Sequence, residues 1–175
     1  MENEEIPKKE GTDRRVERWA RGPVYIASEG FWEATLTIGN ITYHHHRNGG
    51  GWVANTATVD DTAFVGVYAR VEGKAQVLNN AGVEDFALVS DNAVVCDKAR
   101  VEDYARVCDN AVVCDKARVN SNAVVCHNAR VCDKAMVGAW ALVGDKVIVG
   151  GKVRVGGHAK LLGDNVYEGD ELILL

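Results

Sequence analysis

The side chains of this sequence that are best suited to chemistry are its five cysteines and five histidines. A thiol becomes a nucleophile or a metal ligand once it loses its proton, and an imidazole acts as a base or a metal ligand near neutral pH. The cysteines each follow a valine and are spaced by multiples of six residues: Cys96, Cys108, Cys114, Cys126 and Cys132. The histidines are His44, His45, His46, His127 and His158.

The candidate metal ligands in this set are Cys108, Cys126 and His127. They contain no C-x-x-C spacing and no evident fourth ligand, both of which are typical of structural zinc sites. The other interpretation is that the cysteines are reduced thiols that fill a small position in a strand. We therefore expect no bound metal and no cofactor. Another candidate group is the run His44–His46, where alternation favours a solvated strand over a metal or general-base role.

A six-residue repeat positions the five cysteines, His127 and His158. Alanine occupies every sixth position from Ala57 to Ala141, and valine occupies every sixth position from Val53 to Val155. Because the two lie two residues apart, both point to the same side of a short strand. The pair that follows is rich in Asp, Gly, Asn and Ser, which suits a tight turn. A period of six drifts off the face of an α-helix, so the pattern predicts strands.

Three repeats make one coil of 18 residues in this interpretation, and coils stack with inward Ala and Val side chains. We expect an all-β parallel β-helix of about seven coils over residues 51–175. Residues 23–50 are predicted to form an N-terminal β-hairpin cap, with strands over Trp32–Ile38 and Ile41–His46 that meet at Gly39-Asn40. Residues 1–22 are strongly charged and are predicted to be a flexible tail or a short helix.

The repeat resembles the hexapeptide-repeat family, on units such as Ala93-Val94-Val95-Cys96-Asp97-Lys98. This family forms left-handed parallel β-helices, so the resemblance implies that handedness. The stretch Gly49–Val53 and units such as Asn128-Ala129-Arg130-Val131 are similar to uncharacterised YdcK-type bacterial and phage-encoded repeat proteins. These relatives have no established activity. The phage-like similarity adds the hypothesis that the partner is a host or defence protein that the chain blocks.

Many hexapeptide-repeat proteins are acyltransferases, in which a histidine acts as general base and acyl-CoA lies between subunits. The resemblance makes His127 and His158 the candidate catalytic residues, but neither lies in a recognisable motif and no inserted loop interrupts the repeats. Acyl transfer is therefore one alternative function, and an oligomer that sequesters a small ligand is another. We expect a non-catalytic binding or structural protein.

Residues 18 apart should stack in ladders on the outside of the rod. One ladder is rich in rings: Tyr68, Phe86, Tyr104, Asn122, Trp140 and His158. Two outward faces carry apolar residues that are interrupted by charged ones. The first face holds Val94, Val112 and Ile148, and the second holds Leu88, Val124 and Leu142. Exposed apolar residues at this density are typical of contact surfaces, so we expect a homo-oligomer, a trimer or a dimer, or a protein partner. Stacked rings and outward valines also stabilise strands without any partner, and that interpretation stays open.

The composition narrows the classes of function. The formal net charge is -5, and residues 57–165 hold 14 acidic and 13 basic side chains, so no face is expected to bind nucleic acid. No apolar run reaches the length of a membrane helix, and the N-terminus has no secretory pattern. We expect a cytoplasmic protein that contacts neither nucleic acid nor membrane.

Overall fold

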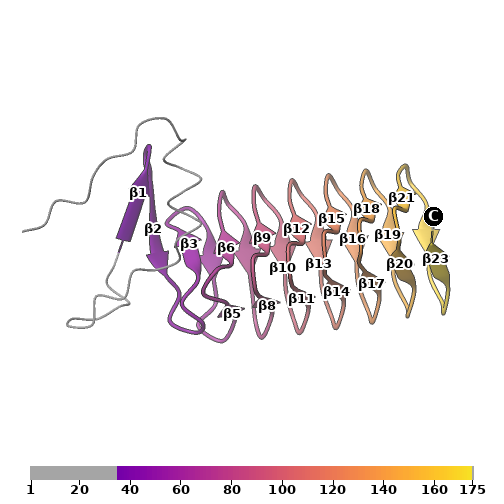
Figure 1. The fold of residues 1–175 in the computed structure, drawn as a ribbon, viewed down its shortest axis with the longest axis horizontal. Helices are drawn as coiled ribbons and strands as arrows, with labels where there is room; N and C mark the ends of the chain where they lie inside the picture. Colours follow the sequence, from indigo (N-terminus) through magenta and orange to yellow (C-terminus); the bar gives the residue numbers. More distant parts are fainter. Residues whose placement is uncertain (1–34, 175) are drawn as a thin grey trace, which may run out of the picture.

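The structure is a computed structural model that describes residues 35–174, and within them it contains strands and turns but no helix. Short strands coil around one long axis to form a parallel β-helix, with the C-terminal coil at the far end from the hairpin (Figure 1). The predicted fold class is confirmed. The predicted tail over residues 1–22 lies outside the described residues.

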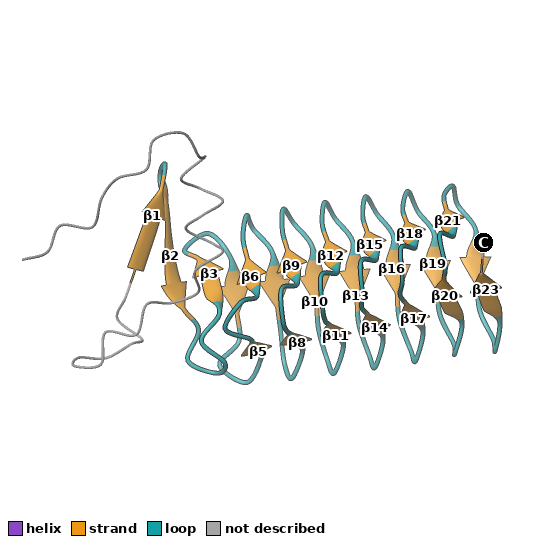
Figure 2. Ribbon diagram, viewed as in Figure 1, coloured by secondary structure: helices purple, strands orange, loops and turns teal. Residues whose placement is uncertain are grey.

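Three sheets form the three faces of the rod, and each coil contributes one strand to each face (Figure 2). The first face holds β1 (Thr35–Ile38), β2 (Ile41–His45), β3 (Trp52–Ala54), β6 (Arg70–Val71), β9 (Leu88–Val89), β12 (Arg106–Val107), β15 (Val124–Val125), β18 (Leu142–Val143) and β21 (Lys160–Leu161). The second face holds β4 (Thr58–Val59), β7 (Gln76–Val77), β10 (Val94–Val95), β13 (Val112–Val113), β16 (Arg130–Val131), β19 (Ile148–Val149) and β22 (Val166–Tyr167). The third face holds β5 (Phe64–Val65), β8 (Gly82–Val83), β11 (Arg100–Val101), β14 (Arg118–Val119), β17 (Met136–Val137), β20 (Arg154–Gly156) and β23 (Leu172–Leu174).

The inside of the rod is a column of alanine and valine. The second residue of each short strand points inward, and the alanine after each turn joins it; Val113 and Ala117 are both 0 % exposed. Parallel pairing places each residue beside the one 18 positions away, as in Val95 beside Val113. The small alanines let the chain turn close to the axis, and the valines fill the space between them. This core is continuous from Val53 to Leu161.

From Gly73 onward, each turn begins with a residue in the left-handed backbone conformation, most often aspartate. Asp115 has a φ of 62°, in a region that few residues other than glycine, asparagine and aspartate adopt readily. Its backbone N–H donates to Asp97 Oδ2 on the preceding coil at 3.2 Å, and its own Oδ2 accepts from the N–H of Asp133 at 3.2 Å. The aspartates therefore serve as acceptors for the backbone donors at successive turns.

A β-hairpin closes the N-terminal end of the rod. Strands β1 and β2 pair antiparallel with Ile38 beside Ile41, and β2 then pairs antiparallel with β3 of the first coil. The predicted turn at Gly39-Asn40 is confirmed. Of the predicted strand over Trp32–Ile38, residues 32–34 lie outside the described part.

The joint between hairpin and rod requires glycine. A Cβ atom on Gly51 would overlap the carbonyl oxygen of Gly66 and lie 2.5 Å from Val65 Cγ1, while Gly49 has a φ of 115°. The run of glycines in the sequence is therefore explained by the close approach of two chain segments.

The C-terminal coil has no such cover among the described residues. Strands β21, β22 and β23 each end their face, and four apolar side chains of this coil are exposed: Leu162, Val166, Leu172 and Leu174. Residues 35–174 include no helix that could cross a membrane.

Candidate functional site

The outer surface of the rod presents three edges, and each edge has its own chemistry. The aromatic edge joins the third face to the first and holds Tyr68, Phe86, Tyr104, Asn122, Trp140 and His158. The asparagine edge joins the first face to the second and holds Lys74, Asn92, Asn110, Asn128, Lys146 and Asp164. The lysine edge joins the second face to the third and holds Asn80, Lys98, Lys116, Lys134, Lys152 and Asp170.

Stacked rings form the N-terminal half of the aromatic edge. The ring centroids of Tyr68 and Phe86 lie 5.0 Å apart at an angle of 15°, and those of Phe86 and Tyr104 lie 5.1 Å apart at 4°. Beyond Asn122 the stack resumes with Trp140 and His158, 6.4 Å apart at 10°. Stacking covers the ring faces, yet Phe86 and Tyr104 remain 51 % and 60 % exposed.

The six apolar residues predicted on the two outward faces take the outward position of their strands. They are half-buried and not fully exposed: Val94, Val112, Ile148, Leu88, Val124 and Leu142. Arg106 and Arg130 interrupt these two rows, as the sequence indicated. The rows therefore offer less accessible apolar surface than the aromatic edge does.

The lysine edge contains a shallow groove of about 790 Å³. Lys98, Lys116 and Lys134 follow one another along it, each beside an aspartate that accepts a backbone N–H. Lys152 forms an ion pair with Asp170 at 3.0 Å. Alternating charges of both signs make this a solvated surface with no dominant field.

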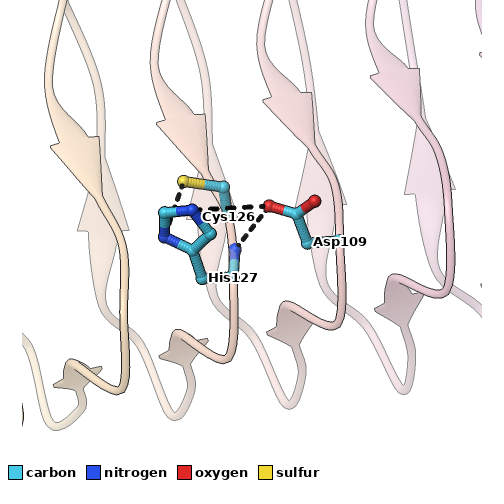
Figure 3. A group of neighbouring side chains, drawn as sticks. All are labelled: Asp109, Cys126 and His127. Carbon is cyan, nitrogen blue, oxygen red and sulfur yellow. Dashed lines mark hydrogen bonds and ion pairs between the residues drawn. The ribbon is translucent and has the colours of Figure 1, made fainter.

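The asparagine edge brings a thiol, an imidazole and a carboxylate together. Cys126 Sγ lies 3.8 Å from His127 Nδ1, and His127 Nε2 lies 4.0 Å from Asp109 Oδ2 on the preceding coil (Figure 3). One ligand atom from each residue falls within 4.8 Å of the others. The structure groups Cys108 with Asp91 and Asp109 instead of with Cys126 and His127.

The thiols are held in their protonated form. Burial raises the pKa of Cys96 and of Cys108 to about 11 and that of Cys114 to about 12, and it also raises the pKa of Cys126 and Cys132. A nucleophilic cysteine needs the opposite shift. All five residues are free cysteines. Their environment therefore does not activate them for nucleophilic chemistry.

The histidines His45 and His46 do not lie on a solvated strand, and that expectation is wrong. His45 is 4 % and His46 is 6 % exposed, and only His44 is exposed as predicted. The strand ends at His45, so the alternation of sides does not continue to His46. His45 Nδ1 lies 2.6 Å from the carbonyl oxygen of Gly50, and His46 Nε2 lies 3.0 Å from that of Ala63.

Burial lowers the pKa of both His45 and His46, against the smaller opposing effect of the hydrogen bonds to the carbonyl groups. Each ring therefore donates from a neutral tautomer. Tyr43 adds a hydrogen bond of 3.1 Å from its hydroxyl to Glu72, and burial raises the pKa of Tyr43 to about 12. These contacts fasten the hairpin to the first coils and have no visible catalytic arrangement.

The two candidate bases His127 and His158 lie on different edges of the rod. His158 continues the aromatic stack, and His127 lies in the cluster with Cys126. Asp109 is the residue of this cluster that sequence reasoning missed. Its position 18 residues before His127 was the available signal, since residues at that spacing stack. Comparisons with known proteins add no constraint, because no family model, curated protein or solved structure matches this chain.

Proposed function

We propose that this chain is a non-catalytic β-helical binding protein that contacts a second copy of itself, or another protein, along the aromatic edge. The observation that carries the proposal is the continuous stack of Tyr68, Phe86 and Tyr104, with ring centroids 5.0 and 5.1 Å apart and each ring more than half exposed. Soluble proteins rarely leave a contiguous apolar strip in water unless something covers it.

The stack has the properties of an anchor for binding. Each ring is held by its neighbours, so little side-chain freedom is left to lose when a partner packs on it. Tyrosine and tryptophan are enriched among the residues that carry most of the binding energy in protein interfaces.

A polar border lies beside the stack on the third face. Arg100 contacts Glu84 at 3.0 Å and Glu102 at 3.7 Å, and Arg118 contacts Glu102 at 3.3 Å. An apolar centre with a charged rim is the usual anatomy of an interface. The half-buried Leu88, next to the stack on the first face, would extend the apolar centre.

The test compares two double variants that alter different edges. The first double variant, Phe86→Ser with Tyr104→Ser, removes two exposed rings from the aromatic edge. The second, Lys98→Ser with Lys116→Ser, removes two side chains from the lysine edge and is the control. Light scattering coupled to size-exclusion chromatography should give an oligomer for the wild type and the lysine variant, and a monomer for the aromatic variant. Because each lost ring pair costs about 0.5–1.5 kcal/mol of stability, the masses must be measured well below the melting temperature. An aromatic variant with the wild-type oligomer mass would place the self-contact elsewhere, and a monomeric wild type would exclude self-association.

A further inference from the structure

The turn at His127 departs from its neighbours on the asparagine edge. The first residue of the equivalent turn is aspartate at Asp91, Asp109 and Asp145, and glycine at Gly73 and Gly163. His127 keeps the left-handed conformation, with a φ of 57°. It also keeps the acceptor role, because its Nδ1 lies 3.2 Å from the donating N–H of Asp145.

That structural role uses only one ring nitrogen. The other nitrogen, Nε2, faces the preceding coil and lies 4.0 Å from Asp109 Oδ2. Cys126 places its Sγ beside the same ring, 3.8 Å from Nδ1, and the residue is only 9 % exposed. An aspartate at position 127 would serve the turn equally well, so the turn alone does not account for an imidazole between a thiol and a carboxylate.

We propose that Asp109, Cys126 and His127 form a binding site for a thiophilic divalent cation such as Zn²⁺, with water as the fourth ligand. Sulfur, imidazole nitrogen and carboxylate oxygen form a donor set that suits Zn²⁺ and excludes Mg²⁺ and Ca²⁺, which prefer oxygen ligands only. Three protein ligands and one open position are a known coordination pattern for zinc.

The three ligand atoms need to move only slightly closer together to bind one Zn²⁺ ion. The three ligand atoms lie within 4.8 Å of one another, whereas zinc bonds of about 2.0–2.3 Å at tetrahedral angles hold ligand atoms about 3.5 Å apart. The side chains of His127 and Asp109 are 55 % and 44 % exposed, so both can turn toward a common centre without disturbing the apolar core. Asp109 Oδ2 already accepts the N–H of His127 at 2.9 Å, so cation binding competes with this turn hydrogen bond. Cys126 is the fixed member of the set.

The surroundings of His127 can satisfy either tautomer of the ring. In the metal-free protein Nδ1 accepts the N–H of Asp145, so the ring proton is on Nε2. When Nε2 binds the cation, Nδ1 carries the ring proton and no longer accepts the N–H of Asp145. Asp145 Oδ1, 3.3 Å from Nδ1, then becomes the acceptor of the ring N–H. A metal-bound histidine whose second nitrogen donates to a carboxylate is the usual arrangement. Binding releases the proton of the Cys126 thiol to solvent.

Two similar groups on the same rod lack the imidazole and serve as internal comparisons. Cys108 lies with Asp91 and Asp109, and it shares Asp109 with the proposed site. Cys114 lies beside Asp115, with its Sγ 3.4 Å from Asp115 Oδ2. A thiol with carboxylates alone is a poorer donor set for Zn²⁺, so we expect a single strong site per chain.

The experiment titrates the full chain with Zn²⁺ by calorimetry and with Co²⁺ by absorption spectroscopy. The wild type should bind one ion, and its Co²⁺ complex should show the near-ultraviolet charge-transfer band of a thiolate ligand. His127→Asn keeps a residue that tolerates the left-handed turn and accepts the N–H of Asp145, yet it removes the imidazole. His127→Asn and Cys126→Ser should each weaken Zn²⁺ binding at least tenfold, and Cys126→Ser should abolish the charge-transfer band.

The controls are Cys108→Ser and Cys114→Ser, which should retain wild-type affinity and the band. Circular dichroism and thermal melting confirm that each variant is folded, so that lost binding is not lost structure. Equal Zn²⁺ affinity in the wild type and in His127→Asn would overturn the proposal. A Co²⁺ complex without a thiolate band would also overturn it, and so would loss of binding in Cys108→Ser but not in Cys126→Ser.

Discussion

The rod and its N-terminal hairpin are stabilised in different ways. In the rod, the same few contacts recur at every coil: a buried valine, a buried alanine and a turn aspartate that accepts a backbone N–H. In the hairpin, each polar contact occurs once, as with His45 on the carbonyl group of Gly50 and His46 on that of Ala63.

This difference explains why the rod is easier to predict from the sequence than the hairpin. A repeated contact leaves a period, whereas a unique contact between segments far apart in the chain leaves no pattern. It also predicts different responses to mutation and to pH. The rod should depend on apolar packing, and the hairpin should depend on neutral histidines.

The largest expected effect is a charge inside the rod. Val113→Asp places a carboxylate where the native side chain is 0 % exposed, without a partner, and should cost upwards of about 4 kcal/mol of unfolding free energy. Val112→Arg, one residue earlier and pointing outward, is the matched control and should cost only about 1 kcal/mol, because Val112 is half-buried and lies directly beside Arg130. Chemical denaturation measures both variants. A Val113→Asp protein of normal stability would contradict the inward assignment.

Replacing a turn aspartate should destabilise the rod less than a buried charge does. Three variants separate the loss of the hydrogen-bond acceptor from the loss of a residue that tolerates the left-handed backbone. Asp115→Ala loses both the acceptor for the N–H of Asp133 and the tolerance of a φ of 62°, and should cost about 2 kcal/mol. Asp115→Gly keeps the backbone freedom and should cost about 1 kcal/mol, while Asp115→Asn should be nearly neutral. If Asp115→Gly and Asp115→Asn are equally stable, the side-chain acceptor at this turn does not stabilise the rod.

The hairpin should loosen when a single histidine is replaced. His46→Leu removes a buried donor to the carbonyl oxygen of Ala63 and should cost about 1–2 kcal/mol, confined to the hairpin and first coil. His44→Leu, at an exposed position two residues earlier, is the control. Hydrogen exchange should accelerate in residues 35–54 of His46→Leu while the central coils keep their protection. Uniform loss of protection along the rod would show that hairpin and rod unfold together.

The smallest effect should be a dependence of the hairpin on pH. Burial lowers the pKa of His45 and His46 below the ordinary value of 6.5, so the folded hairpin resists protonation that the unfolded chain accepts. The stabilisation is therefore fully present above pH 6.5 and is lost progressively as the pH falls below it. NMR titration of the histidine rings, together with hairpin protection at several pH values, measures this. A double variant, His45→Gln with His46→Gln, should lose the pH dependence.

Most of the rod could be predicted because its physics is periodic. The inward positions of Val113 and Ala117, the stacking of Tyr68, Phe86 and Tyr104, and the asparagine ladder through Asn92, Asn110 and Asn128 all follow from spacings of six and 18 residues. The candidate metal cluster could be predicted only in part, because Cys126 and His127 are adjacent in the sequence whereas the carboxylate of Asp109 comes from the preceding coil.

The sequence alone determined the parallel β-helix, the inward residues and the hairpin turn, since alternation and period act locally and repeat. Only the tertiary structure decided that His45 and His46 are buried and that the outward valines are half covered. Each of these depends on how far a side chain reaches across to a neighbouring coil or segment, and residue order does not encode that distance. The exposed apolar residues of the last coil, Leu162, Val166, Leu172 and Leu174, likewise follow from where the stack of strands ends.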